Sequence, residues 1–312
     1  MSELSSPDIR TVNAEQVLAH LPMRAAVDAL KQALLQGFDP SQAHTRTSAG
    51  LTHGEFLMMP SEFGDYAGVK ILTVGPGNPQ RGLPKIQGQY LLFDADTLAP
   101  LALIDGVALT AIRTPAVSAL GVDILAAPDA SDLLVFGTGP QAEYHVRAVA
   151  AVREISRVGI VGRSGNKTDR LVAALNAEGF NARTASEDDV AGADIITCCT
   201  AASEPLFDGE AVRDGAVVVA MGSHTPDARE TDDALARRAA FYVEDVDTAL
   251  REAGDAAIPI QRHLLRREDL RDLSTMVSEG KRTTSRPALF KTVGMGWQDL
   301  VTAKALFENL PG

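Results

Sequence analysis

The chain has 312 residues, of which 45% are hydrophobic and 22% are charged, and its formal net charge at pH 7 is −12. A chain longer than roughly 250–300 residues usually divides into domains, and this composition is typical of a globular protein. The acidic balance excludes the broad basic field with which proteins hold nucleic acid or an anionic membrane.

We expect neither a membrane span nor a secretory signal. No run of about 18 apolar residues occurs, and the first eight residues contain neither a basic nor an apolar segment. The only two cysteines, Cys198 and Cys199, are adjacent in an apolar stretch, where they fill core space rather than pair. We therefore expect a reduced, cytoplasmic protein with no membrane and no nucleic acid as partner.

Residues 1–128 predict a mixed α+β domain. Two helical segments come first, at about 14–20 and 22–36, and three strand-like segments follow at 56–59, 68–72 and 89–94. These strands lack regular helical crossovers. The last segment, about 297–310, has a helical pattern, and we expect residues 291–312 to pack back on the first domain.

From residue 129 onward, strands and helices alternate. The predicted strands are apolar throughout, which suits strands covered on both faces of a parallel sheet. They lie at 133–136, 157–161, 194–199, 216–221 and 240–243, with helices at 141–151 and 167–178 between the earlier ones. The pattern predicts an α/β fold over residues 129–290, a Rossmann-type doubly wound parallel sheet.

A dinucleotide-binding fingerprint of the form G-x-G-x-x-A follows the first of these strands. It consists of Gly137, Thr138, Gly139, Pro140, Gln141 and Ala142. The first glycine permits a tight turn, the second lets the backbone approach a pyrophosphate, and the alanine keeps the helix close to the strand. The helix start offers N–H groups to the anion. Because the fingerprint stands between a strand and a helix, we predict nucleotide binding rather than an unrelated glycine turn.

The residues after the second predicted strand of this region, 157–161, indicate whether NAD(H) or NADP(H) is preferred. NAD-specific sites usually place an acidic residue there for the ribose hydroxyls, whereas this chain has Arg163 and Ser164, with Lys167 nearby. Arginine and serine bind a 2′-phosphate that an acid would repel. We therefore expect NADP(H) to be preferred and NAD(H) to be possible. The alternative is that these residues are ordinary polar loop residues and that both cofactors are accepted.

Four separated motifs together resemble the ornithine cyclodeaminase/mu-crystallin family. They are GVALTAIRTPAVSALG (106–121), FGTGPQAEYH, MGSHTPDARE and FKTVGMGWQDLVTAKA (290–305). The resemblance implies a subunit with a nicotinamide-binding Rossmann domain, placed here at 129–290, and a substrate-binding and dimerisation domain, placed at 1–128. It also implies a homodimer and a small imino or 2-oxo acid as the partner.

The resemblance places the family's carboxylate-binding cations at Arg46, Lys70 and Arg113. The chemistry agrees, because an arginine fork holds a carboxylate with two hydrogen bonds and a lysine inside an apolar strand needs an anion. Each has an alternative: Lys70 could reach water from an edge strand, Arg113 could start a helix and pair with Asp105, and Arg46 could be a surface charge. Gln87 is a further candidate for the substrate pocket, with weaker support.

His224 stands at the end of the strand 216–221. In a cyclodeaminase the resemblance places a catalytic aspartate there, within a motif like G-D-x-P-G-K-x-E, which aligns here through Pro226 and Glu230. This tip resembles the mu-crystallin and ketimine reductase branch. An imidazole there can donate a proton or hydrogen bond, so Lys70 and His224 are the candidate catalytic residues. The alternative is that His224 caps the next helix or contacts the cofactor amide.

The function that these features favour is an NAD(P)H-dependent ketimine reductase. It would reduce a cyclic imino acid, such as Δ1-pyrroline-2-carboxylate or Δ1-piperideine-2-carboxylate, to the L-amino acid. The alternatives are an amino-acid dehydrogenase of the alanine or arginine type, an ornithine cyclodeaminase, and a non-catalytic NADPH-binding crystallin-like protein. The other histidines show no metal-ligand spacing, so we predict no metal.

Overall fold

The computed structural model describes residues 8–281 and 285–311. The chain divides into two compact units, residues 1–113 with 294–312 and residues 114–293. We call them the terminal unit and the central unit. Sequence analysis placed the boundaries after residues 128 and 290. The residues 1–7, which bore on the expected lack of a secretory signal, lie outside the described part.

The terminal unit contains a six-stranded sheet in the order β1-β6-β5-β4-β3-β2. Strands β2 to β6 pair antiparallel with their neighbours, and only β1 joins parallel, beside β6. The strands are β1 (Arg10–Val12), β2 (Thr47–Leu51), β3 (Gly54–Phe63), β4 (Tyr66–Val74), β5 (Ile86–Asp94) and β6 (Pro100–Asp105). The expected α+β class of this part is confirmed.

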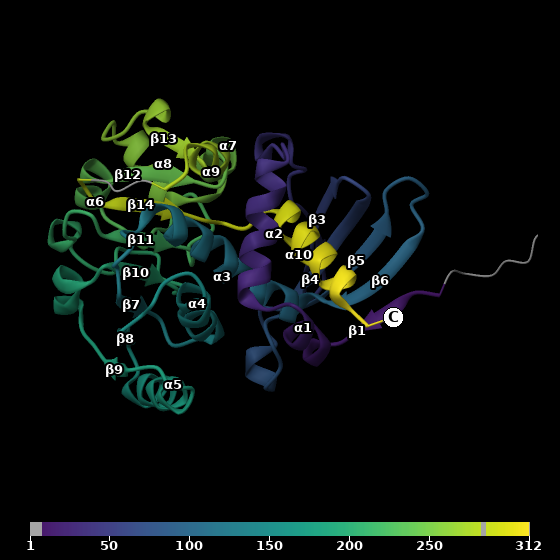
Figure 1. The fold of residues 1–312 in the computed structure, drawn as a ribbon, viewed down its shortest axis with the longest axis horizontal. Coiled ribbons are helices and arrows are strands. Elements are labelled where there is room, and N and C mark those ends of the chain that lie inside the picture. Colours follow the sequence, from purple (N-terminus) through teal and green to yellow (C-terminus); the bar gives the residue numbers. More distant parts are fainter. Residues whose placement is uncertain (1–7, 282–284, 312) are drawn as a thin grey trace, which may run out of the picture. The chain divides into compact units, whose positions relative to one another are not determined.

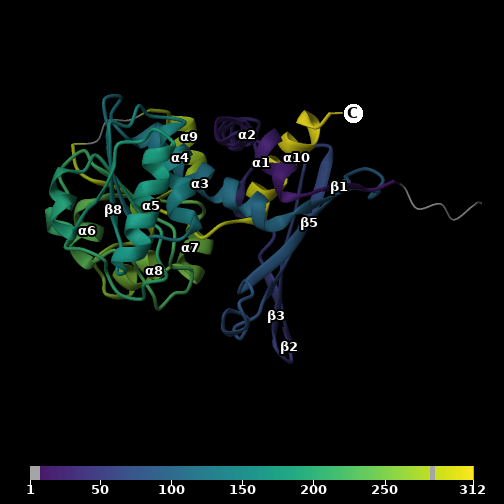
Figure 2. The same cartoon turned by 90° about the horizontal axis from the view of Figure 1, so that it is seen from below.

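The helices of the terminal unit include α1 (Ala14–His20), α2 (Met23–Leu35) and α10 (Gly296–Asn309). Helix α10 packs on β3, β4 and β5 and against α2, so the end of the chain returns to its beginning (Figure 1). Trp297 of α10 is fully buried and stacks on Phe38, with 5.1 Å between ring centroids. Figure 2 shows β2, β3 and β5 extending beyond the end of the sheet that these helices cover.

The central unit contains an eight-stranded parallel sheet in the order β13-β12-β14-β11-β10-β7-β8-β9. Because β8 and β9 extend one way from β7 and β10 and β11 the other, the sheet is doubly wound, as expected. Its strands are β7 (Asp132–Phe136), β8 (Arg157–Val161), β9 (Ala182–Thr184), β10 (Ile195–Cys198), β11 (Val217–Ala220), β12 (Ala240–Val243), β13 (Leu270–Asp272) and β14 (Ala288–Lys291).

The helices that accompany this sheet in the described part of the chain are α4 (Pro140–Ala150), α5 (Gly165–Ala177), α6 (Asp233–Arg238), α7 (Val246–Glu252), α8 (Gly254–Gln261) and α9 (Leu273–Glu279). The predicted helices agree with the observed ones to within two residues at each end. Strand β14 was not predicted, and the expected boundary at residue 290 cuts through it. Its four residues are buried between β11 and β12, although it ends in a lysine.

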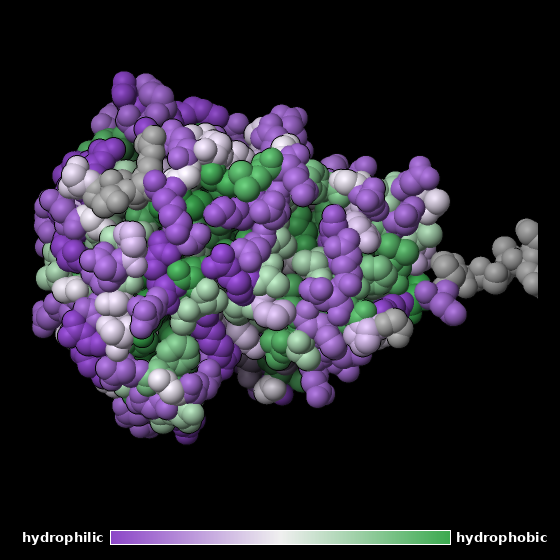
Figure 3. Space-filling view, viewed as in Figure 1, coloured by the Kyte–Doolittle hydropathy of each residue, from purple (hydrophilic) through white to green (hydrophobic). Residues whose placement is uncertain are grey.

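Helix α3 (Gly106–Leu125) runs from the terminal unit into the central unit. The helix is long and apolar enough to cross a membrane, with a mean hydropathy of 1.3 over its most apolar 18 residues. However, 83% of that segment is buried in the fold. Because it is buried to this extent, its apolar composition is that of a core helix. On the face that Figure 3 shows, hydrophilic residues are spread over both units with apolar residues among them.

Candidate active site

The glycine-rich loop between β7 and α4 has the geometry of a pyrophosphate cradle. Gly137 adopts φ +124°, a conformation that favours glycine, and a Cβ there would collide with the carbonyl oxygen of Cys199. A Cβ on Gly139 would meet nothing within 4 Å, so the backbone is open to a ligand. Helix α4 begins at Pro140 without a side-chain cap, which leaves backbone donors for an anion. Ala142 is fully buried against the sheet.

The turn between β8 and α5 adjoins this loop and carries the candidate 2′-phosphate ligands. A Cβ on Gly162 would lie 2.5 Å from Thr138 Cγ2, so the two loops touch. The side chains of Arg163, Ser164 and Lys167 are exposed, and Ser164 is the N-cap residue of α5 but makes no capping hydrogen bond. Within the described part of the chain, Arg163 and Lys167 form no ion pair, so both charges are available to a phosphate.

A buried histidine supports the first turn of α4. His145 is fully buried, its Nδ1 lies 2.7 Å from the Gln141 carbonyl oxygen, and its Nε2 lies 2.9 Å from Ser118 Oγ. Burial lowers the pKa of His145 to about 4, and the Gln141 contact opposes this only in part. The imidazole is therefore neutral at pH 7, with Nδ1–H donating to Gln141 and Nε2 accepting from Ser118. Nothing in the sequence around His145 indicates this supporting role.

A buried carboxylate, that of Glu230, holds the carboxyl end of the central sheet. In the sequence, Glu230 serves only to align the motif that contains His224. One oxygen of Glu230, Oε1, accepts from the Thr200 N–H at 2.9 Å and from Thr200 Oγ1 at 2.7 Å. The other, Oε2, accepts from the Gly222 N–H at 2.7 Å. Burial raises the pKa of Glu230. Glu230 thereby ties the ends of β10 and β11 together.

Two further buried charges complete this cluster. Lys291, the last residue of β14, donates to the Ser223 carbonyl oxygen at 2.6 Å and forms an ion pair with Asp255 at 3.2 Å. Asp255 Oδ1 also accepts from the backbone N–H groups of Glu230 and Thr231. The sequence indicates this ion pair only weakly: Lys291 ends an apolar run, and Asp255 stands in an apolar helix. Neither indicates which distant group is the partner.

His224 lies directly after this braced backbone. Its side chain is exposed, and Nδ1 lies 3.2 Å from the Gly222 carbonyl oxygen. The hydroxyl of Ser223 donates to the Ala228 carbonyl, and the N–H of Gly254 donates to Thr225 O at 2.9 Å, so the turn is held on both sides of His224. The imidazole is thus presented to solvent from a fixed backbone, and the N-cap residue of the following helix α6 is Asp232 rather than His224.

In the terminal unit, Lys70 is a fully buried lysine on an interior strand. Strand β4 lies between β3 and β5, so Lys70 is not on an edge strand. Its Nζ lies 2.9 Å from both carboxylate oxygens of Asp299 on α10 and 3.3 Å from Thr110 Oγ1. Burial first, and then the charge of Arg113, lowers the pKa of Lys70 to about 7, while Asp299 opposes that shift.

Arg113 shares this counter-ion. It lies within α3 rather than at its start, and its Nε donates to Asp299 Oδ1 at 3.0 Å. Its Nη1 donates to Gln298 Oε1 at 3.2 Å. The expected alternative partner, Asp105, instead accepts from the Ala108 N–H at the start of α3.

Arg46 joins the same cluster through Gly294. Arg46 is partly buried, and its Nη2 donates to the Gly294 carbonyl oxygen at 2.8 Å. A Cβ on Gly294, whose φ is +82°, would lie 2.5 Å from Arg113 Nη1. The structure therefore places Lys70 and Arg113 on one carboxylate, Asp299, which the sequence did not indicate, and links Arg46 to Arg113 through Gly294.

The strand register separates Gln87 from this cluster. Gln87 pairs with Thr73, and Lys70 pairs with Tyr90, three positions away. Since successive side chains alternate between the faces of a sheet, Gln87 lies on the face opposite Lys70. Its side chain is exposed. By the same alternation, Met59, which pairs with Lys70, shares the face of the cations.

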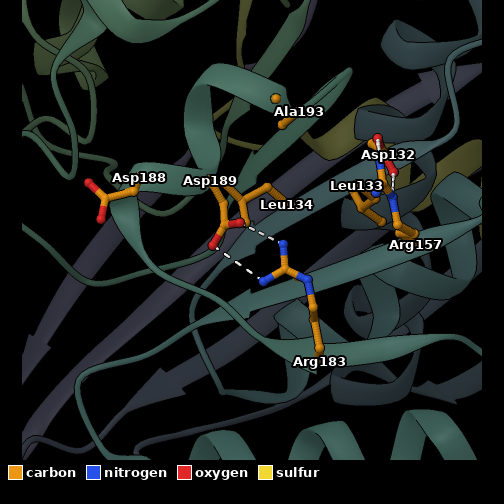
Figure 4. A pocket seen from close by; sticks show the side chains of 10 residues that line it. Asp132, Leu133, Leu134, Arg157, Arg183, Asp188, Asp189 and Ala193 are labelled. Carbon is orange, nitrogen blue, oxygen red and sulfur yellow. Dashed lines mark hydrogen bonds and ion pairs between the residues drawn. The ribbon is translucent and has the colours of Figure 1, made fainter.

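A separate pocket of about 240 Å³ lies over the amino-terminal halves of β7 and β8, away from the glycine-rich loop at the carboxyl end of β7. Figure 4 shows that its two arginines are paired with acids: Arg183 lies 2.6 Å from Asp189, and Arg157 Nε donates to Asp132 at 2.6 Å. Because these arginines have partners, the pocket offers no free cation to an anionic ligand.

Comparison with known proteins shows the family to which this chain belongs. The model of the ornithine cyclodeaminase/mu-crystallin family matches residues 8–312. The chain belongs to this family. The expected resemblance is thereby confirmed over almost the whole sequence.

Three similar members of the ornithine cyclodeaminase/mu-crystallin family are reductases by name. The Δ1-pyrroline-2-carboxylate reductase of Colwellia psychrerythraea is 33% identical, with 97% of this chain and 99% of that protein covered. The ketimine reductase mu-crystallin of Mus musculus is 31% identical, with 96% of each covered. A similar solved structure is that of Thermococcus litoralis Δ1-pyrroline-2-carboxylate reductase in complex with NADH and L-proline. Its TM-score is 0.89 and its sequence is 26% identical, with 96% of this chain and 97% of that one covered.

Proposed function

We propose that this protein is an NAD(P)H-dependent ketimine reductase that converts a cyclic imino acid, such as Δ1-pyrroline-2-carboxylate, to the L-amino acid. The observation that carries the proposal is the cluster in the terminal unit, where two buried cations, Lys70 and Arg113, share the carboxylate of Asp299 and Arg46 is linked to them through Gly294. Two buried cations against one carboxylate leave Lys70, Arg113 and Asp299 with a net positive charge, which fits the carboxylate of an imino acid. The names of the relatives support the same reaction.

The chain's own residues have simple tasks in this reaction. The arginines and Lys70 hold the substrate carboxylate, which orients C2 of the imine. Bound NAD(P)H would supply the hydride that reduces the protonated C=N bond of the oriented substrate to an amine. Because an iminium ion is already electrophilic, little acid catalysis is required. His224 donates a hydrogen bond or a proton, in place of the aspartate that a cyclodeaminase needs.

The same proposal assigns NADP(H) as the preferred cofactor. Gly137 and Gly139 form the pyrophosphate cradle, and Arg163, Ser164 and Lys167 bind the 2′-phosphate. The exposure and lack of ion pairs of Arg163 and Lys167 among the described residues support this assignment. NAD(H) remains an acceptable cofactor, and a relative binds NADH.

We further propose a cytoplasmic homodimer. All five residues of the edge strand β2 are exposed, and Leu51 of β2 and Phe56 of β3 are 49% and 38% exposed on one face of the sheet. An edge strand presents unpaired backbone N–H and C=O groups with which another chain can pair, and a second copy of this chain would cover them together with Leu51 and Phe56. The free thiols Cys198 and Cys199 suit a reducing compartment.

A substrate panel tests the function. Oxidation of NADPH and NADH is followed with Δ1-pyrroline-2-carboxylate, Δ1-piperideine-2-carboxylate, and linear 2-oxo acids with ammonia. We expect turnover of the cyclic imines, with NADPH favoured. Turnover of only the linear acids with ammonia would identify a dehydrogenase, proline formation from ornithine a cyclodeaminase, and tight NADPH binding without turnover a storage protein.

A further inference from the structure

Asp299 joins Lys70 and Arg113, two of the cations that the proposed function assigns to the substrate carboxylate. Its Oδ1 accepts hydrogen bonds from Lys70 Nζ at 2.9 Å and from Arg113 Nε at 3.0 Å, and its side chain is fully buried. We propose that Asp299 is the positioning residue of the substrate site: it supplies the counter-charge of the Lys70 ammonium and sets the direction of the Arg113 guanidinium. This inference rests on the proposed ketimine reductase function.

The contacts of Arg113 explain how one carboxylate orients a guanidinium. Asp299 occupies Nε and Gln298 occupies one hydrogen of Nη1, and both partners are adjacent residues of α10. A guanidinium held at Nε and Nη1 has only one orientation of its plane. The remaining hydrogens, on Nη1 and Nη2, form the edge that a substrate carboxylate can meet. Gly294 keeps this edge accessible, because a Cβ there would lie 2.5 Å from Nη1.

The charges around Lys70 show why an anion is needed there before substrate binds. Arg113 and Thr110 approach from α3, Tyr90 faces Lys70 from β5, and Arg46 acts from the segment before β2. Among the described groups that influence Lys70, Asp299 is the one that favours the charged amine. A buried ammonium beside a guanidinium loses its proton unless an acid compensates. Without Asp299, Lys70 would be a neutral amine and a poor carboxylate ligand.

Tyr90 is a second group that responds to Asp299. Its hydroxyl is buried without a hydrogen-bond partner among the described residues, and burial followed by the charge of Asp299 raises its pKa. The phenol therefore stays neutral and cannot replace the carboxylate. The counter-charge at Lys70 thus depends on Asp299, which α10 brings from a position 229 residues away in the sequence.

The decisive variant is Asp299→Asn, which keeps the shape and one acceptor oxygen but removes the charge. We expect the KM for Δ1-pyrroline-2-carboxylate and the Kd for L-proline to rise at least about tenfold, as for the loss of a charge-assisted contact. The Kd for NADPH should be unchanged, because the glycine-rich loop belongs to the central unit. Glu308→Gln is the matched control: it removes an acid that is 50% exposed on the same helix and should leave all three constants as they were.

The pH dependence separates positioning from a merely structural role. In the wild type, affinity for L-proline should fall as pH rises through the pKa of Lys70, about 7. In Asp299→Asn, the midpoint of this fall should move to lower pH by at least about one unit. A role in folding alone would lower the active fraction equally at every pH and leave the midpoint in place.

Failure of this inference is distinct from failure of the proposed function. If the wild type turns over no imine, the function is wrong. If the wild type is active and Asp299→Asn keeps its KM and its pH midpoint, Asp299 is not the positioning residue. Should Asp299→Asn not fold, Lys70→Met and Lys70→Met/Asp299→Asn are compared for L-proline binding. The double variant should bind more weakly, because Arg113 has also lost its partner, and equal affinities overturn the inference.

Discussion

Glu230 closes the turn at the end of β11 by accepting a hydrogen bond from the Gly222 N–H at 2.7 Å. Its other oxygen holds Thr200, so one buried side chain fixes the backbone that precedes His224. The reactive imidazole that we propose is therefore exposed, while the groups that place it are buried.

Removal of this brace should destabilise the central unit. Glu230→Ala leaves the half-buried N–H groups of Thr200 and Gly222 without their acceptor, and each lost hydrogen bond costs about 0.5–1.5 kcal/mol. We expect the free energy of unfolding, measured with urea, to fall by at least that amount. Asp227→Ala, which removes an exposed acid of the same turn, is the control and should change it by less than about 0.5 kcal/mol. Equal effects of the two substitutions would contradict the bracing role.

His224→Ala tests the proposed proton or hydrogen-bond donor. Loss of general-acid help is typically 10²–10⁴-fold, and we expect the lower end, about 10²-fold in kcat, because a protonated imine is already activated. The Kd for NADPH should hardly change. A wild-type rate of imine reduction from pH 6 to 9 in this variant would make the imidazole structural.

Ser164→Asp should change the cofactor preference. The substitution removes a 2′-phosphate donor and adds a repulsive charge beside Arg163. The ratio of kcat/KM with NADPH to that with NADH should fall at least about tenfold, which corresponds to roughly 1.4 kcal/mol. An unchanged ratio would show that the 2′-phosphate is bound elsewhere.

Lys70→Met should abolish the pH dependence of substrate binding. In the wild type the charged form of Lys70 predominates below its pKa of about 7 and is lost above it. The KM for the imino acid should therefore rise as pH increases through 7. In Lys70→Met the KM should be high and flat over the same range. A rising KM in that variant would assign the titration to another group.

His145 should make the protein sensitive to acid. Its pKa is about 4 in the fold and near 6.5 when exposed, so the unfolded chain binds the additional proton between these values. This contribution to stability is complete above about pH 6.5 and is lost as pH falls toward 4, by about 3 kcal/mol. His145→Gln should reduce the slope of Tm against pH in that window. If the slope is unchanged, His145 is not the titrating group.

Local sequence patterns were sufficient to predict much of the secondary structure and the glycine-rich loop. The apolar runs predicted the parallel strands β7, β8, β10, β11 and β12 but not the short β9, and the spacing of Gly137, Gly139 and Ala142 predicted the loop that the structure shows. These features depend on neighbours close in sequence, because strand periodicity and a glycine turn are properties of a short segment. The motifs also identified the family correctly.

The pairing of buried charges was decided only by the tertiary structure. Lys70, Arg113 and Lys291 are each conspicuous in the sequence, but their partners Asp299 and Asp255 lie far along the chain, on helices brought in by packing. Strand β14 was missed for the same reason, since its place between β11 and β12 comes from the sheet and not from its four residues. A buried ion needs its counter-ion within about 4 Å, and that proximity is a property of the fold alone.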